Sequence, residues 1–279
     1  MNANNPFPLG IFSWFGYRLP MRERLTMISK AGFTVTSAWW GPEEDPAIRE
    51  DLARMVNDAG LILDNFHVPF AAANDLWSDD PSVREHLVAE HVAWLRDCSR
   101  NADPATGSIP KMVMHVAFNE GPPALNRHGI ESVRQVVDAA EGLGVTVAVE
   151  NTRRLDCMEL VLREIESPHL VFCYDSSHDW LPTGGKTDVL RRWGHRLAVT
   201  HLSDNDGIED RHWPPGDGIV DWPALAAALA ATPYTGCINL ELLTRDDTVP
   251  PAQFLAHVFD KAQWIASLVQ THRHKEDQT

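Results

Sequence analysis

The sequence predicts one α/β domain, a single (β/α)8 barrel that spans residues 1–270. Short β-rich runs alternate eight times with amphipathic helical runs, and this alternation is typical of a closed parallel sheet. The length of 279 residues is close to that of one such barrel. The doubly wound open sheet is disfavoured, because Ser13-Trp-Phe-Gly-Tyr-Arg18 follows the first strand in place of the glycine-rich GxGxxG turn.

The eight predicted strands are short and apolar. They cover about 8–14, 34–40, 62–67, 111–117, 145–150, 170–175, 196–202 and 236–242. The helical runs between them cover about 21–31, 45–59, 82–100, 129–143, 157–166, 187–194, 222–231 and 251–270. Gly32, Gly60 and Gly144 each follow a helical run, as glycines that end helices do. Residues 271–279 are polar, and we expect a flexible tail there.

Two strands indicate which face looks into the barrel. In residues 145–150 the valines share one face, and Thr146, Ala148 and Glu150 share the other. Residues 237–241 alternate in the same way, and the face with Cys237 ends in Glu241. We expect the apolar rows to pack on the helices and the smaller or polar rows to face the barrel axis.

The bulk composition limits the class of protein. At 44% hydrophobic and 23% charged residues, the chain has the composition of a globular protein. The net charge of −15 disfavours nucleic acid as a partner, because phosphate contacts need Lys and Arg. The four cysteines lack CxxC spacing, which indicates reduced thiols. Neither a signal peptide nor a membrane span is evident, so we expect a cytoplasmic protein.

Acidic and histidine side chains follow the predicted strands at the end where such barrels place their active sites. Six consecutive strand ends carry one each: His67, His115, Glu150, Asp175, His201 and Glu241. A lone histidine at a strand end is more often a packing residue than a ligand. Six gathered together would repel one another or lack partners unless a cation neutralised them. The recurrence therefore predicts a divalent-metal site.

This pattern resembles the xylose isomerase-like TIM barrels, which include sugar epimerases and isomerases, inosose dehydratases and the endonuclease IV group. The resemblance covers nearly the whole chain. Its most specific pieces are Glu150-Asn-Thr, Asp175-x-x-His178, His201-x-x-Asp204 and Glu241. The epimerase pattern implies one divalent cation (Mn2+, Co2+, Mg2+ or Zn2+) bound by Glu150, Asp175, His201 and Glu241. It also implies that His178 and Arg211 contact substrate oxygens.

The sequence also resembles the endonuclease IV pattern, in which three zinc ions are bound by a larger set. That set here would be His67, His115, Glu150, Asp175, His178, His201, Asp210, His212 and Glu241. The number of metals therefore stays open. The charge of −15 and the lack of Lys- or Arg-rich strand-end loops argue against DNA as the substrate.

The resemblance implies proton transfer next to a carbonyl of a sugar, through an enediolate that the metal stabilises. Glu150 and Glu241 would be the catalytic groups, one removing the proton and the other returning it. Return to the same carbon gives epimerisation, return to the neighbouring carbon gives isomerisation, and loss of a β-hydroxyl gives dehydration. Trp14, Trp40, His67 and His115 are further candidate substrate contacts.

The sequence also bears on two other functional classes and on oligomeric state. A non-catalytic barrel is disfavoured because no ligand position is broken, and a serine hydrolase is disfavoured because no GxSxG elbow is present. A homo-oligomer stays open, with Trp94 and Trp264 on predicted helices as candidate contact residues.

Overall fold

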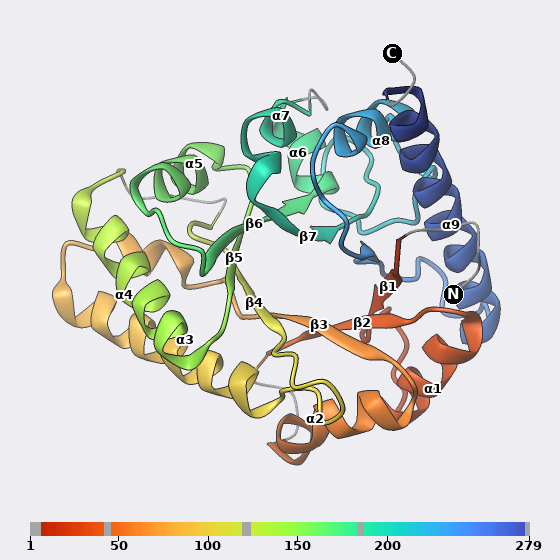
Figure 1. The fold of residues 1–279 in the computed structure, drawn as a ribbon, viewed down its shortest axis with the longest axis horizontal. Coiled ribbons are helices and arrows are strands. Elements are labelled where there is room, and N and C mark those ends of the chain that lie inside the picture. The colour runs from red at the N-terminus through yellow and green to blue at the C-terminus, as the bar shows by residue number, and fades with distance from the viewer. Residues whose placement is uncertain (1–6, 42–45, 119–123, 184–186, 277–279) are drawn as a thin grey trace.

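The computed structural model describes residues 7–41, 46–118, 124–183 and 187–276. The expected barrel residues 1–6, the expected helix residue 45 and the expected tail residues 277–279 lie outside these ranges. Within them, eight strands form one parallel sheet in the order β7-β6-β5-β4-β3-β2-β1-β8. Helices surround the strands on the outside (Figure 1). The predicted fold class, a (β/α)8 barrel, is confirmed.

The strands lie within or close to the predicted ranges. They are β1 (Leu9–Phe12), β2 (Val35–Trp39), β3 (Ile62–His67), β4 (Lys111–Met114), β5 (Val147–Glu150), β6 (Leu170–Asp175), β7 (Leu197–His201) and β8 (Ile238–Leu240). Between β7 and β8, the backbone N–H of Leu202 donates to the Asn239 carbonyl at 2.9 Å. The N–H of Glu241 donates back to the Leu202 carbonyl at 3.2 Å. These bonds close the ring of strands.

The helices follow the strands as expected, with one addition. They are α1 (Met21–Ala31), α2 (Pro46–Asp58), α3 (Pro81–Arg100), α4 (Arg127–Leu143), α5 (Leu155–Glu164), α6 (Ser176–Thr183), α7 (Asp188–Trp193), α8 (Trp222–Ala230) and α9 (Pro251–Glu276). Short 3-10 turns cover Ala73–Trp77 and Gly194–Arg196. Helix α6, which the sequence pattern does not predict, begins directly after β6 and carries His178 into the site. None of the described helices combines the length and the apolar character needed to span a bilayer.

The expected strand faces are confirmed by two separate buried clusters. Val113, Ala148, Cys173 and Val199 form a small apolar cluster inside the barrel. The outward valines of β5 belong instead to the large core that includes the helices. All four cysteines of the chain are buried and none forms a disulfide.

The last helix continues past residue 270, where we expect the polar tail to begin. Helix α9 ends at Glu276. Arg273 accounts for the extension, since its guanidinium donates to the carbonyl oxygens of Thr232 and Tyr234. The same guanidinium lies 4.9 Å from the centroid of the Phe7 ring. Contacts with the loop before β8 and with the start of the chain therefore hold this turn against the barrel.

Candidate functional site

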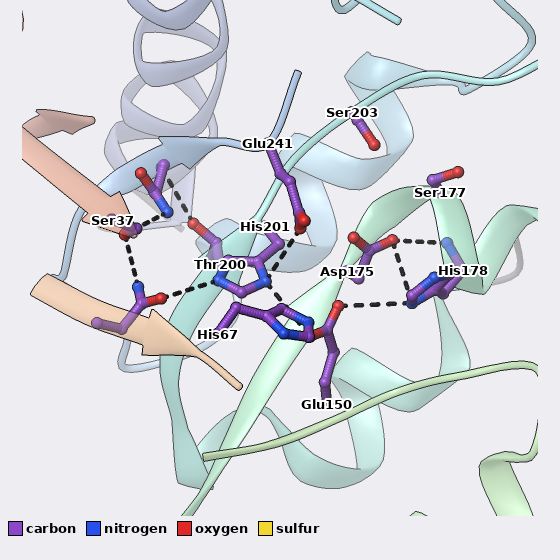
Figure 2. A network of polar contacts seen from close by, with 12 residues as sticks. Ser37, His67, Glu150, Asp175, Ser177, His178, Thr200, His201, Ser203 and Glu241 are labelled. Carbon is purple, nitrogen blue, oxygen red and sulfur yellow. Dashed lines mark hydrogen bonds and ion pairs between the residues drawn. The ribbon is translucent and has the colours of Figure 1, made fainter. Parts of the chain in front are cut away.

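Glu150 lies at the centre of a buried polar cluster at the carboxyl end of the barrel (Figure 2). Its Oε2 lies 3.0 Å from His67 Nε2, 3.5 Å from His115 Nε2 and 3.4 Å from His201 Nδ1. Its Oε1 lies 3.5 Å from His178 Nδ1. Because parallel strands end at the same rim, β3, β4, β5 and β7 bring these side chains together although 134 residues separate the first from the last.

Two further carboxylates complete the cluster. Glu241 Oε2, just after β8, lies 3.2 Å from His201 Nδ1. Asp175 ends β6, and its Oδ1 accepts from the backbone N–H of His178 at 2.6 Å in the first turn of α6. Asn151 joins the two strands, because its side chain accepts from the Asp175 N–H and donates to the Asp175 carbonyl, both at 2.8 Å. The motifs Glu150-Asn-Thr and Asp175-x-x-His178 are therefore structurally linked.

The cluster fits a cation, because several of its atoms lack a hydrogen-bond partner among the described residues. These atoms are Glu150 Oε1 and Oε2, Asp175 Oδ2, His115 Nε2 and His201 Nδ1. Buried polar atoms are normally paired, so a group of unpaired acceptors indicates a missing positive partner. Candidate ligand atoms lie within 4.8 Å of one another in three groups, which are His67–His115–Glu150, Glu150–Cys173–His201 and Glu150–Asp175–His178.

The electrostatics suit such a cation. Burial raises the pKa of the Asp175 carboxyl to about 8, attraction by His178 opposes the rise, and repulsion from Glu150 adds to it. Burial also opposes ionisation of Glu150, but His201 and His67 hold its pKa well below the usual range. Burial lowers the pKa of His115 to about 4. A neutral His115 imidazole therefore faces an ionised Glu150 carboxylate. For His201 and His178 burial opposes protonation, but nearby acidic groups raise the pKa of both imidazoles well above the usual range. A bound cation would take the place of these protons.

A second group of possible ligands lies beside the first. Asp210 Oδ2 lies 3.0 Å from His178 Nε2 and 3.3 Å from His212 Nε2, while its Oδ1 accepts from the Ser177 hydroxyl at 2.6 Å. His212 adopts a positive φ of 50°, and its Nδ1 lies 3.2 Å from the Glu241 carbonyl. Such a backbone conformation is strained for a residue with a side chain, and strain of this kind clusters at functional sites.

Asp204 holds the loop that carries Asp210 and His212. Its fully buried carboxylate accepts from the backbone N–H groups of Asn205, Gly216 and Val220 and from the indole N–H of Trp222, at 2.9–3.0 Å. A Cβ added at Gly218 would lie 2.1 Å from the Asn205 carbonyl oxygen. The tight turn that the glycines permit thus closes around the Asp204 carboxylate.

Three of the expected substrate contacts do not reach the cluster. Arg211 points to the surface, where it pairs with Asp206 at 2.8 Å and Glu209 at 2.7 Å. Trp14 is 37% exposed and lies near the Arg24 guanidinium. Trp40 is buried on the outer face of the sheet, where its indole N–H donates to Asp97.

Three other aromatic side chains, Trp39, Phe70 and Phe118, form a wall beside the histidines of the cluster. Trp39 lies 5.1 Å from the His67 ring, and Phe70 stacks on His115 with ring centroids 4.5 Å apart. Phe118 continues the wall at 5.9 Å from Phe70. The sequence places Trp39 and Phe118 among the aromatic residues near strand ends, and strand alternation puts Trp39 on the same face as Ser37. No periodic signal marks Phe70, which follows the end of its strand.

Comparisons with known proteins agree with this architecture. The chain is 29% identical to the protein y4fM of Sinorhizobium fredii over 253 residues, which are 79% of this chain and 80% of that protein. It is 20% identical to fructoselysine 3-epimerase of Escherichia coli O157:H7 over 253 residues, 84% of this chain and 90% of that enzyme. A structure of L-ribulose 3-epimerase covers 97% of each chain with a TM-score of 0.75 at 17% identity. The family described as xylose isomerase-like TIM barrel matches residues 25–267. The chain therefore belongs to the xylose isomerase-like TIM barrel family.

Proposed function

We propose that this chain is a divalent-metal-dependent sugar isomerase or epimerase that acts by proton transfer next to a carbonyl. One observation carries the proposal: Glu150 and Glu241 both contact His201 Nδ1, at 3.4 and 3.2 Å, from different strands. Two carboxylates around one ligand position provide a base and an acid on two sides of a bound substrate carbon. The names of two relatives, fructoselysine 3-epimerase and L-ribulose 3-epimerase, support the same chemistry.

Four residues would hold the cation, namely Glu150, Asp175, His201 and Glu241. A divalent ion there would supply Lewis-acid stabilisation of the negative charge that develops on substrate oxygens when the α-proton leaves. The buried surroundings strengthen every such interaction, because Asp175 and His201 are both 0% exposed.

The protein's own groups would move the proton. One of Glu150 and Glu241 removes it from the carbon next to the carbonyl, and the other returns a proton from the opposite side. A glutamate can be both ligand and base when only one of its oxygens is on the cation. His178 and the histidines at 67 and 115 would contact substrate oxygens, and the aromatic wall would pack against C–H faces of the sugar.

Solvent-deuterium exchange tests this function. The protein with bound Mn2+ or Co2+ is incubated in D2O with a panel of ketoses and inososes, and NMR follows the proton next to the carbonyl. We expect exchange with at least one compound, and Glu241→Gln should slow it by about 10²–10⁴-fold. Glu209→Gln is the matched control, because Glu209 is exposed and pairs only with Arg211 in the described structure. Absence of exchange with every compound would contradict the proposal.

A second candidate, a multinuclear zinc phosphoesterase, is favoured by the two extra ligand groups. His67 and His115 add to Glu150 on one side, and Asp210 with His212 adds to His178 on the other. Elemental analysis of the purified protein separates the two functions. Two or three zinc ions per chain that fall in His67→Ala and His212→Ala would support the phosphoesterase. One metal that both variants retain, as does the control His169→Ala at the far end of β6, would support the isomerase.

A further inference from the structure

A buried polar network lies directly below His201, and it comes from three other strands. His201 Nε2 lies 3.3 Å from the side-chain oxygen of Asn65 on β3. The Asn65 amide donates to the Ser37 hydroxyl on β2 at 2.8 Å, and Asn239 on β8 donates to the same hydroxyl at 3.0 Å. All four side chains are at most 1% exposed. Figure 2 shows Ser37 and His201 on this side of the cluster.

An irregularity in β3 turns Asn65 inward. Thr36 of β2 pairs with Leu63, but Ala38 pairs with Phe66, so that Asp64 and Asn65 together lie opposite Ser37. An extra residue of this kind is a β-bulge, which re-aims a side chain. Without it, Asp64 and Asn65 would point to opposite faces. With it, both belong to the polar network, and Asp64 pairs with Lys111 at 2.7 Å.

The chemistry of its partners fixes the orientation of the Asn65 amide. Its nitrogen lies 2.9 Å from Asp64 Oδ2, and a carboxylate can only accept. The amide oxygen must therefore face His201, and an oxygen in turn requires a proton on His201 Nε2. In a neutral imidazole this leaves the lone pair on Nδ1, the nitrogen that faces Glu150 and Glu241.

We propose that Asn65 is a positioning residue that selects the tautomer and the ring plane of His201, so that Nδ1 is presented to the cation. The inference rests on the metal-dependent function proposed above, which it deepens. Neither Asn65 nor the bulge contacts the carboxylates of the cluster in the described structure. Its effect therefore passes through His201, as that of a group that hydrogen-bonds a metal-binding histidine does.

Cobalt affinity of the full chain, followed by calorimetry, tests the proposal. We expect Asn65→Leu, which has a similar volume but no acceptor, to weaken Co2+ binding by about 10–100-fold. Ser37→Ala should weaken it less, because the amide keeps its bond to Asp64. Asn101→Leu is the matched control: Asn101 is 2% exposed and also makes three side-chain hydrogen bonds, but between outer helices. We expect that control to lose stability and to keep its cobalt affinity.

A spectroscopic readout separates positioning from general destabilisation. In protein loaded with 113Cd and labelled with 15N-histidine, we expect cadmium coupling to His201 Nδ1 and a proton on Nε2, assigned with His201→Gln. Coupling to Nε2 would overturn the proposal. So would cobalt affinities of the wild type and Asn65→Leu that agree within twofold, or a wild type that binds no cobalt. If affinity depends on Asn65 but no sugar proton exchanges, this proposal stands and the isomerase function fails.

Discussion

Replacement of Asp204 by asparagine tests whether one carboxylate holds the loop that carries Asp210 and His212. Asp204 accepts four hydrogen bonds in a fully buried position. An asparagine keeps one oxygen and places its NH2 group against one pair of donors, either the N–H groups of Asn205 and Val220 or those of Gly216 and Trp222. The shape of the side chain is conserved, so that the change acts on hydrogen bonding rather than on volume.

The structure sets the expected size of the effect. One amide oxygen can serve about two of the four donors, so two hydrogen bonds to a charged group are lost. At about 1.5–3 kcal/mol each, Asp204→Asn should lower the free energy of unfolding by about 3–6 kcal/mol. The midpoint of urea denaturation, followed by tryptophan fluorescence, measures this loss. Because the loop carries two candidate ligands, metal content in excess of one ion per chain should fall as well.

The same loop provides the matched control. Asp217 lies 3.8 Å from Lys261, with about a third of its side chain exposed. Asp217→Asn should change the free energy of unfolding by no more than about 0.5 kcal/mol. An Asp204→Asn protein whose stability differs from that of Asp217→Asn by less than 1 kcal/mol would refute the view that this carboxylate organises the loop.

Three other outcomes are expected. Burial lowers the pKa of His91 to about 4. Below about pH 6.5 this histidine therefore binds a proton in the unfolded chain but stays neutral in the folded chain. The stabilising contribution of neutral His91 is therefore present above that pH and should fall by about 2 kcal/mol from pH 7 to pH 5. His91→Leu should flatten this part of the urea-midpoint profile, and equal slopes would contradict it. Saturation with Co2+ at 100 times its Kd should raise the unfolding free energy by about 2.7 kcal/mol over chelator-treated protein, and differential scanning fluorimetry should show the higher Tm. Glu150→Gln should abolish this rise, because Glu150 belongs to all three ligand groups; a variant with the full rise would exclude Glu150 as a ligand.

The barrel and its rim were predictable because both depend on local patterns. Alternation along 145–150 puts the valines on one face of the strand and Glu150 on the other. The strand order then places Glu150 beside the ends of β4 and β6. The clustering of His67, His115 and His201 around it follows from closure of the ring, which the number of β-then-α repeats already indicates. No long-range contact had to be known for these residues.

The remaining features depend on information that sequence periodicity does not carry. Trp39 and Trp40 are equally aromatic, and a shift of one residue decides which faces the site. The bulge at Asp64–Asn65 is defined by its pairing with Ser37 and is not visible in the β3 sequence alone. Helix α6 begins within the polar run after Asp175, where the helical pattern is only 8 residues long.

The side chains of the triplet Asp210-Arg211-His212 distinguish the epimerase pattern from the endonuclease IV pattern. Asp210 faces His178 and His212 faces Asp210, whereas Arg211 between them pairs with Asp206 and Glu209 at the surface. An arginine on substrate oxygens, as the epimerase pattern implies, needs the Arg211 side chain to leave Asp206 and Glu209. The described arrangement of side chains therefore presents the second ligand group and leaves Arg211 with its surface partners. Since the described conformation presents the second ligand group, His212→Ala is the variant whose metal content separates the two patterns most directly.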